Sequence, residues 1–306
     1  MKLSAVTSLF KYYPLPEALR VIAAAGYQGV ELWGGFPHGF VDDFFDGQVL
    51  DRKVVAACRD LLSTSCLEPV AFLPEQCFYP VNLLIDDAPP FDAERLRARS
   101  YAYFERAIAV TAALEIPKML VTTPFWGWYR QPDGWYHRHD KPLDRVIETF
   151  AGLARTAERN GVTLVLEPLT HLETTAVETL DDLLAVLDGV ASPALAAMVD
   201  TGHVHVTAHR LGLDSDAYFR EHVERLGARL QHVHVDDNRG DVDAHLVPGE
   251  GTFDFQRGYG ALREHGYDGY LSAELMMFGA NPVPPEPASL LHRTRAHASA
   301  LWETPR

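Results

Sequence analysis

The stretch Val162–Glu173 reads VTLVLEPLTHLE, and it decides how the rest of the chain is interpreted. The run from Val162 to Leu166 is apolar or β-branched, without alternating polar residues, which is typical of a strand buried on both faces of a parallel sheet. The run stops at the carboxylate Glu167, and a second carboxylate, Glu173, follows six positions later. Because an isolated buried charge is costly, an acid at the tip of such a strand needs a partner.

The same pattern recurs along the whole chain, with amphipathic helical segments such as 14–26 and 143–161 between the apolar runs. Alternating strands and helices, with strands apolar on both faces, predict a parallel sheet, and eight repeats in a chain of this length predict one closed (β/α)8 TIM barrel of the α/β class. We expect a single domain over 1–306 with a C-terminal helical tail from about residue 280. The eight apolar runs are 2–10, 27–34, 68–73, 117–125, 162–168, 195–203, 230–238 and 270–278.

Length and composition restrict the class of protein. The chain has 306 residues, 47% of them hydrophobic, which is enough for a large core, and it holds no apolar run long enough to span a membrane. Its N-terminus lacks the apolar region of a signal peptide, so we expect a soluble protein located in the cytoplasm. A formal charge of −15 argues against a nucleic-acid partner, because binding to phosphate backbones rests on basic contacts. The three cysteines are not spaced as a zinc knuckle or a disulfide framework.

The ends of the apolar runs carry the residues that we expect to form the site. In a TIM barrel the carboxyl ends of the strands converge on the active site. Glu167, Asp200, His234 and Glu274 stand at or near the ends of four successive runs. Any one of these acids alone could cap a helix or join an ion pair, but three carboxylates in one pocket would repel each other unless a cation lay among them. A divalent metal resolves this, and the oxygen-rich set suits Mn²⁺, Mg²⁺ or Co²⁺, with Zn²⁺ as a further candidate.

Three further histidines lie within, at the end of or shortly after apolar runs. We expect His232 and His234 to face opposite sides of their strand, with His234 inside the barrel and His232 packed outside. His203 lies three residues after Asp200 and could orient a metal ligand or contact a substrate. His38 follows the second apolar run, next to glycines that would let the backbone approach a ligand.

An aromatic segment, 125–139 (FWGWYRQPDGWYHRH), follows the fourth apolar run. Its rings, with Trp126 as the first tryptophan, could stack on the flat face of a bound ligand. They could also form a lid over the site. Two readings without a ligand remain open, in which the rings cover the barrel or form an oligomer contact.

The chain resembles the xylose isomerase-like superfamily of sugar isomerases and epimerases, and within it the fructoselysine 3-epimerases and other ketose 3-epimerases. The likeness covers nearly the whole chain and its segments occur in the same order. The segments that carry it are GYQGVELWGGFPHGF (26–40), PEQCFYPVNLL (74–84), LEPLTHLE (166–173), MVDTGHVH (198–205) and DVDAHLVPGEG (241–251).

The resemblance implies a metal-dependent epimerase or isomerase. The residues that match the family's single-metal ligands are Glu167, Asp200, His234 and Glu274, with Mn²⁺ the expected ion. In such enzymes the metal polarises a ketose carbonyl, and two glutamates, here Glu167 and Glu274, remove a proton from one face of the neighbouring carbon and return one to the other. A one-base isomerase could use the same ligands.

The resemblance also implies residues that contact the substrate. Glu173 and His203 match positions that bind sugar hydroxyls in the family. His245 lies near a position at which those enzymes have a substrate-binding arginine. Because this chain has a histidine there, the resemblance does not define the chemical group at the far end of the substrate. We expect a small-molecule sugar or sugar conjugate as substrate and a homo-oligomer as the assembly.

Two alternatives and one excluded function follow from the same likeness. The chain also resembles the catalytic α subunits of C-glycoside deglycosidases, which act on 3-keto C-glycosides and work with a small β subunit. A non-catalytic sugar-binding barrel is the second alternative. Asp243 and His245 resemble a D-x-H pair that binds an additional metal in AP endonucleases, but the third apolar run ends in AFLPEQC without a histidine, and the negative charge argues against DNA repair.

Overall fold

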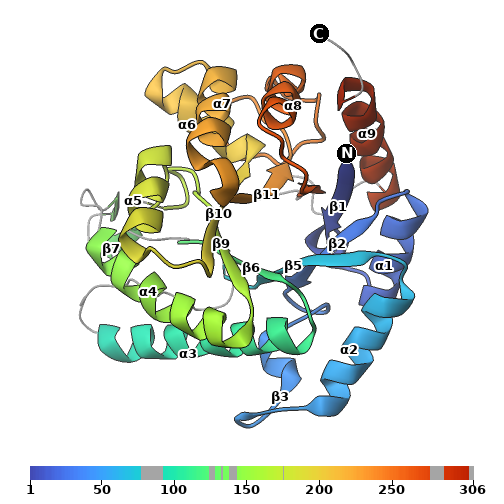
Figure 1. Cartoon of the computed structure of the whole chain (residues 1–306), viewed down its shortest axis with the longest axis vertical. Helices are drawn as coiled ribbons and strands as arrows, with labels where there is room; N and C mark the ends of the chain where they lie inside the picture. Colours follow the sequence, from blue (N-terminus) through green and yellow to red (C-terminus); the bar gives the residue numbers. More distant parts are fainter. Residues whose placement is uncertain are drawn as a thin grey trace.

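The computed structural model describes residues 1–76, 92–123, 128–131, 134–137, 143–174, 176–275 and 286–302. A closed barrel of parallel strands forms its centre (Figure 1). In barrel order the strands are β1 (Lys2–Val6), β12 (Tyr270–Ala273), β11 (Leu230–Val235), β10 (Leu195–Asp200), β9 (Thr163–Leu166), β6 (Lys118–Val121), β5 (Glu68–Pro74) and β2 (Gly29–Gly34). Each apolar run of the sequence supplies one strand, so the prediction of a TIM barrel is confirmed.

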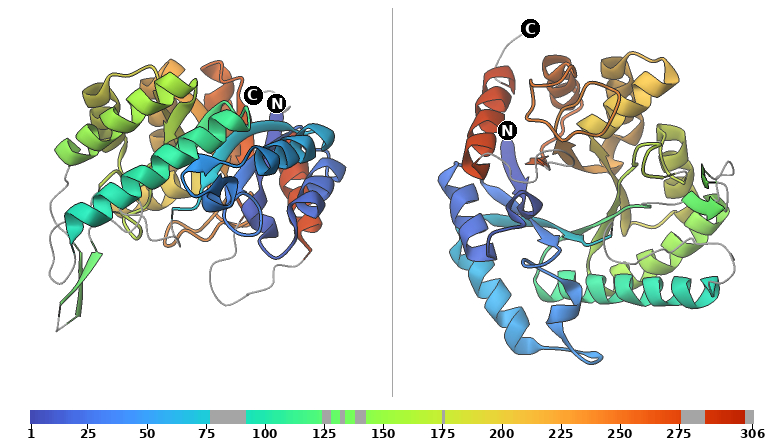
Figure 2. Two further views of the ribbon diagram at one scale, coloured as in Figure 1. Left: turned by 90° about the horizontal axis from the view of Figure 1, so that it is seen from below. Right: turned by 180° about the vertical axis from the view of Figure 1, so that it is seen from behind.

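Helices surround the barrel in chain order, as the two views of Figure 2 show. The helix α9 closes the ring beside α1 near the N-terminus, and Tyr27 holds it there by donating a hydrogen bond to the backbone oxygen of Leu291 at 3.0 Å. Among the described helices, none is both long enough and apolar enough to cross a membrane. The helices are α1 (Leu15–Ala24), α2 (Arg52–Thr64), α3 (Ala93–Ala113), α4 (Leu143–Asn160), α5 (Leu180–Val190), α6 (Thr201–Leu211), α7 (Ser215–Leu226), α8 (Phe255–Glu264) and α9 (Pro287–Trp302).

Shorter elements lie between these. The described residues include three 3₁₀ helices, η1 (Thr7–Phe10), η2 (Val41–Phe44) and η3 (Gly227–Arg229). Two antiparallel hairpins are described, β3 (Phe45–Asp46) with β4 (Val49–Leu50), and β7 (Trp128–Gln131) with β8 (Gly134–His137). The second hairpin belongs to the aromatic segment, and it stands out from the barrel in Figure 2.

Local sequence explains where several helices begin and end. Thr179 and Asp182 form a capping box at the start of α5, in which each side chain accepts a hydrogen bond from the other's backbone N–H. Asp200 ends β10 and also caps α6, since its side chain accepts a hydrogen bond from the backbone of His203 at 2.9 Å. Helix α6 stops at Gly212, whose φ of +69° is readily adopted by glycine. Strand and helix are thus joined at Asp200 without a loop.

Alternation along the strands divides the core into two parts. In β9, Leu164 and Leu166 belong to the large core between strands and helices, whereas Val165 belongs to a small apolar cluster with Met198. Because side chains two apart share a face of a strand, the positions that follow Val165 and Met198 on the inner face are Glu167 and Asp200. The barrel interior is therefore apolar at one end and acidic at the carboxyl end of its strands.

Candidate metal centre

The carboxyl ends of four strands bring four potential ligands together. Glu167 directly follows β9, Asp200 ends β10, His234 lies in β11 and Glu274 directly follows β12. One donor atom from each lies within 4.8 Å of those of the others, and all four residues are at most 5% exposed. These are the four residues predicted from the sequence to bind a metal, and the structure gathers them at one place.

Several polar atoms of this group are buried without a hydrogen-bond partner in the described part of the chain. They are Oε1 of Glu167, Oδ2 of Asp200 and Nδ1 of His234. Nδ1 of His234 lies 2.7 Å from Glu274 Oε2, 3.4 Å from Glu167 Oε1 and 3.8 Å from Asp200 Oδ2. Buried polar atoms without partners are costly, and three carboxylates around one imidazole fit a divalent cation that accepts oxygen and nitrogen donors.

The pKa shifts within the group also favour a bound cation. Burial raises the pKa of Glu167 to about 7, although His234 and His203 oppose the shift. Burial also opposes the charge on Glu274, but His234 outweighs it and lowers the pKa of that carboxyl. For His234 burial disfavours the proton, yet Glu31 and Glu274 outweigh it and raise the pKa well above its ordinary value. Without a cation, a proton on His234 and a proton shared by the acids must balance this cluster.

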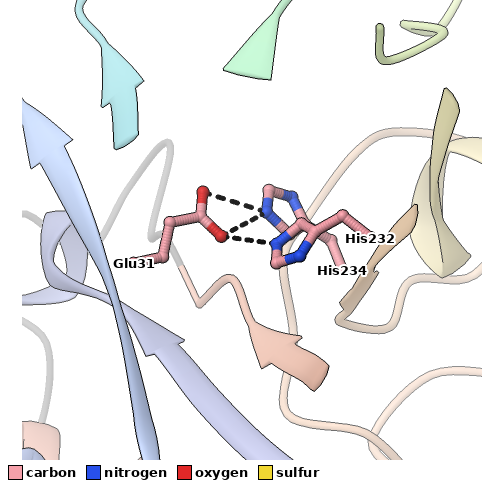
Figure 3. A group of neighbouring side chains, drawn as sticks. All are labelled: Glu31, His232 and His234. Carbon is pink, nitrogen blue, oxygen red and sulfur yellow. Dashed lines mark hydrogen bonds and ion pairs between the residues drawn. The ribbon is translucent and has the colours of Figure 1, made fainter. Parts of the chain in front are cut away.

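Behind the four ligands, Glu31 of β2 contacts both histidines of β11 (Figure 3). His232 Nε2 lies 2.7 Å from Glu31 Oε2, and His234 Nε2 lies 3.0 Å from the same oxygen. The expectation that His232 faces away from the barrel interior was wrong. Residues two apart on a strand lie on the same face, so His232 and His234 both point inward.

A second group of ionisable side chains lies beside the first. Asp243 Oδ2 is 3.3 Å from His203 Nε2 and 2.7 Å from His245 Nε2, and Asp236 Oδ2 is 2.5 Å from His245 Nδ1. His203, Asp243 and His245 also satisfy the geometry of a potential metal group. The D-x-H pair noted in the sequence therefore meets His203 in space.

The two groups differ in their balance of charge. Burial disfavours a proton on His203 and on His245, but the surrounding carboxylates raise both pKa values well above the ordinary value. Burial likewise opposes ionisation of Asp243, but the two histidines hold its pKa well below the usual range. This group contains its own positive charges, whereas the first has three carboxylates around one imidazole, so the first group has the greater need for a cation.

Glu173 lies at the edge of the second group. Its Oε2 accepts a hydrogen bond from Thr170 Oγ1 at 3.0 Å and lies 3.8 Å from His203 Nε2, and its side chain is 28% exposed. His203 is itself fixed by Pro168, whose backbone oxygen lies 3.0 Å from Nδ1. Glu173 and His203 are thus adjacent, and of the two Glu173 is the one that is partly exposed to solvent.

Comparison with known proteins agrees with this geometry. The family model described as a xylose isomerase-like TIM barrel matches residues 19–293. The chain belongs to this family. The resemblance stated from the sequence is thereby confirmed.

Relatives with named activities include two epimerases and a dehydratase. Fructoselysine 3-epimerase of Shigella flexneri is 29% identical over 296 residues, 97% of this chain and 98% of that protein. D-psicose 3-epimerase of Agrobacterium fabrum is 27% identical over 63% of this chain and 60% of that protein. Inosose dehydratase of Halalkalibacterium halodurans is 28% identical over 46% of this chain and 48% of that protein.

Solved structures share the fold at lower identity. A D-psicose 3-epimerase crystallised in the presence of D-fructose matches with a TM-score of 0.74 and 18% identity over 99% of this chain and all of that chain. A 3-keto-D-glucoside 4-epimerase from E. coli matches with a TM-score of 0.73 and 19% identity over 98% of this chain and 99% of that chain. At this identity the likeness shows the fold of the family and no more.

The ring of His38, a predicted substrate contact, is held by the surrounding chain. The ring nitrogens of His38 lie 3.1 Å from Thr7 Oγ1 and 2.9 Å from the backbone oxygen of Tyr13, so the surrounding chain satisfies both. Its ring also packs edge-on against Trp33, at 5.8 Å between centroids. Trp126 lies outside the described residues, as do the side chains of the whole aromatic segment 125–139.

Two residues of the site, Glu31 and Asp236, were not predicted from the sequence. Glu31 stands in the middle of the apolar strand β2, between Val30 and Leu32, and a lone acid there is a sign of a buried partner. Asp236 follows His232 and His234 at the same spacing of two, which places it on the same inner face. Both signals were present, but the partners of Glu31, His232 and His234, lie 201 and 203 positions away along the chain.

Proposed function

We propose that the chain is a metal-dependent ketose 3-epimerase, in which Glu167 and Glu274 are the two bases. The observation that carries the proposal is the gathering of these glutamates with Asp200 and His234 at the carboxyl end of the barrel. The fructoselysine 3-epimerase that matches nearly the full length supports the reaction class. We propose Mn²⁺ as the metal, since three carboxylates and one imidazole form a hard, oxygen-rich set.

The chemistry of the chain's residues follows from this arrangement. When bound by Glu167, Asp200, His234 and Glu274, a divalent metal supplies Lewis-acid polarisation of the sugar carbonyl and acidifies the proton on the adjacent carbon. One glutamate takes this proton as the C–H bond breaks, and the electron pair moves toward the carbonyl oxygen to give an enediolate of the sugar. The other glutamate gives a proton to the opposite face of the same carbon, which inverts its configuration.

The second group would hold the sugar in place. Glu173 and His203 lie next to the metal ligands and can bind hydroxyl groups, as an acceptor and a donor respectively. His245, buried between Asp236 and Asp243, would lie at the far end of the substrate. Its contacts with these two carboxylates would hold its ring in place. We further propose that the protein acts in the cytoplasm as a homo-oligomer.

A C-glycoside deglycosidase is the second candidate, because the same bases could deprotonate a 3-keto C-glycoside and let the aglycone leave. The observation that favours it is the aromatic segment 125–139, whose rings could stack on an aglycone. In that case a small β subunit would be the partner. The first proton transfer is common to both candidates, and the substrate separates them.

The test is product formation by Mn²⁺-loaded protein on fructose, psicose, tagatose, fructoselysine and a 3-keto C-glycoside, followed by proton NMR. A C3 epimer of one ketose, lost on chelation, would support the epimerase. Cleavage of the 3-keto glycoside alone would favour the deglycosidase. Absence of any product from metal-loaded protein would argue for a sugar-binding barrel.

A further inference from the structure

Glu31 is a fully buried carboxylate in the middle of β2 that accepts hydrogen bonds from three side chains. His232 Nε2 lies 2.7 Å and His234 Nε2 lies 3.0 Å from its Oε2, and Ser272 Oγ donates to the same oxygen at 3.1 Å. None of the three donors is more than 1% exposed. Because hydrogen bonds to a charged group in a dry interior are strong, this carboxylate has a well-defined position.

The contact crosses the interior of the barrel. In barrel order β2 and β11 are separated by β1 and β12, so Glu31 reaches His234 through the space inside the strands. Figure 3 shows the carboxylate and the two imidazole rings pointing toward one another from their strands. His232 and Ser272 contact Glu31 but are not among the four ligands, and they fix the carboxylate from β11 and β12.

The two ring nitrogens of His234 face different partners. Nε2 lies 3.0 and 3.2 Å from the two oxygens of Glu31, and an ionised carboxylate can only accept, so Nε2 carries the hydrogen. Nδ1, on the other side of the ring, faces Glu167, Asp200 and Glu274. A ring held in this way would offer the lone pair of Nδ1 to a cation bound among these carboxylates.

We propose that Glu31 is a positioning residue, which orients His234 and selects the tautomer whose Nδ1 binds the metal. It acts through His234 and does not touch the substrate. The proposal rests on the metal site of the proposed function, but it does not depend on which sugar is converted.

The first test is the affinity for Mn²⁺, measured by titration with electron paramagnetic resonance of the free ion. Glu31→Gln keeps the size of the side chain but removes the charge and allows an amide N–H to face the ring. We expect its Mn²⁺ affinity to fall about 10- to 100-fold, the usual cost of removing a group that orients a metal ligand. The control is His222→Gln, because His222 is equally buried but lies on α7 and bonds the backbone of Tyr218. Its Mn²⁺ affinity should match that of the wild type.

An affinity of folded Glu31→Gln within twofold of the wild-type value would overturn the proposal. A second measurement needs no variant. In Zn²⁺-loaded wild-type protein labelled with ¹⁵N-histidine, long-range ¹H–¹⁵N correlation should give a protonated Nε2 and an unprotonated Nδ1 for His234. The reverse assignment would contradict the proposal even if Glu31→Gln failed to fold.

These readouts are separable from the proposed function. Both concern metal binding and the state of one imidazole, with no sugar present. Wild-type protein that shows the expected tautomer and affinities but converts none of the sugars would refute the epimerase and leave the role of Glu31 intact. Wild-type protein that converts a sugar but shows the opposite tautomer of His234 would support the epimerase and refute the role of Glu31.

Discussion

Glu167 and Glu274 approach the same atom, since Oε1 of one and Oε2 of the other lie 3.4 Å and 2.7 Å from Nδ1 of His234. They come from the ends of β9 and β12, two strands separated in the barrel by β10 and β11. A pair of carboxylates converging on one imidazole is a strained arrangement for like charges, and it is relieved by a proton or by a cation.

Metal binding should stabilise the fold, because the bound cation compensates carboxylates that repel each other. At a free Mn²⁺ concentration one hundred times the dissociation constant, we expect the free energy of unfolding to rise by about 2.7 kcal/mol. Urea denaturation with Mn²⁺ and with chelator measures this. The control is Asp200→Asn, which can still cap α6 but loses one charge. It should lose most of the stabilisation by metal and be at least as stable as the wild type in chelator; equal stabilisation of both proteins by Mn²⁺ would count against the site.

The protein should bind one metal ion per chain. The group of Glu167, Asp200, His234 and Glu274 has an excess of negative charge, whereas His203 and His245 neutralise Asp243 in the neighbouring group. Elemental analysis after extensive dialysis against buffer without metal measures the ratio. Two ions per chain, with one lost in His245→Gln, would show that the second group also binds metal.

Glu173 should contribute to substrate binding and not to metal binding. It lies at the open edge of the site, and Glu173→Gln should raise KM about 10- to 100-fold, as expected for loss of a hydrogen bond to a charged group. The metal content should stay unchanged. The neighbouring exposed Leu172, replaced by alanine, is the control and should leave both quantities unaltered. A loss of metal from Glu173→Gln would mean that this carboxylate belongs to the metal site instead.

His222 should make the fold sensitive to acid. Burial lowers its pKa from 6.5 to about 4 in the folded protein. Because the folded pKa is below the unfolded value, the unfolded chain takes up the proton first, so stability present above pH 6.5 is lost as pH falls toward 4. The loss from this residue is about 3 kcal/mol between pH 7 and pH 4. Urea denaturation in chelator at both pH values should give His222→Gln a smaller loss than the wild type by about this amount; identical losses in the two proteins would refute the assignment.

The fold and the positions of the four candidate metal ligands could be predicted from the sequence because both depend on local pattern. Each apolar run identifies one strand, and the residues at the carboxyl ends of all strands lie at the same end of the barrel. Glu167, Asp200 and Glu274 can therefore be predicted without knowledge of the contacts between them. Their common location follows from the closure of the barrel.

The residues behind the ligands could not be found in the same way. Glu31 and His234 are partners across the barrel, 203 positions apart, and only the order of the strands in space brings them together. His232 was misplaced for a different reason, since its spacing of two from His234 already put both on one face. Position in the sequence therefore predicts which residues point inward, but not which of them meet.

We propose that Glu167 and Glu274 remove and return a proton at the carbon next to a ketose carbonyl, with a metal present. Exchange in D₂O, followed by proton NMR on Mn²⁺-loaded protein with the panel of ketoses, measures this proton transfer. We predict that deuterium enters C3 of at least one ketose, that chelator abolishes this, and that Glu274→Gln supplied with saturating Mn²⁺ slows it about 10²- to 10⁴-fold. Metal-loaded wild-type protein that exchanges no C3 proton of any ketose, or Glu274→Gln that exchanges at the wild-type rate, would contradict the account.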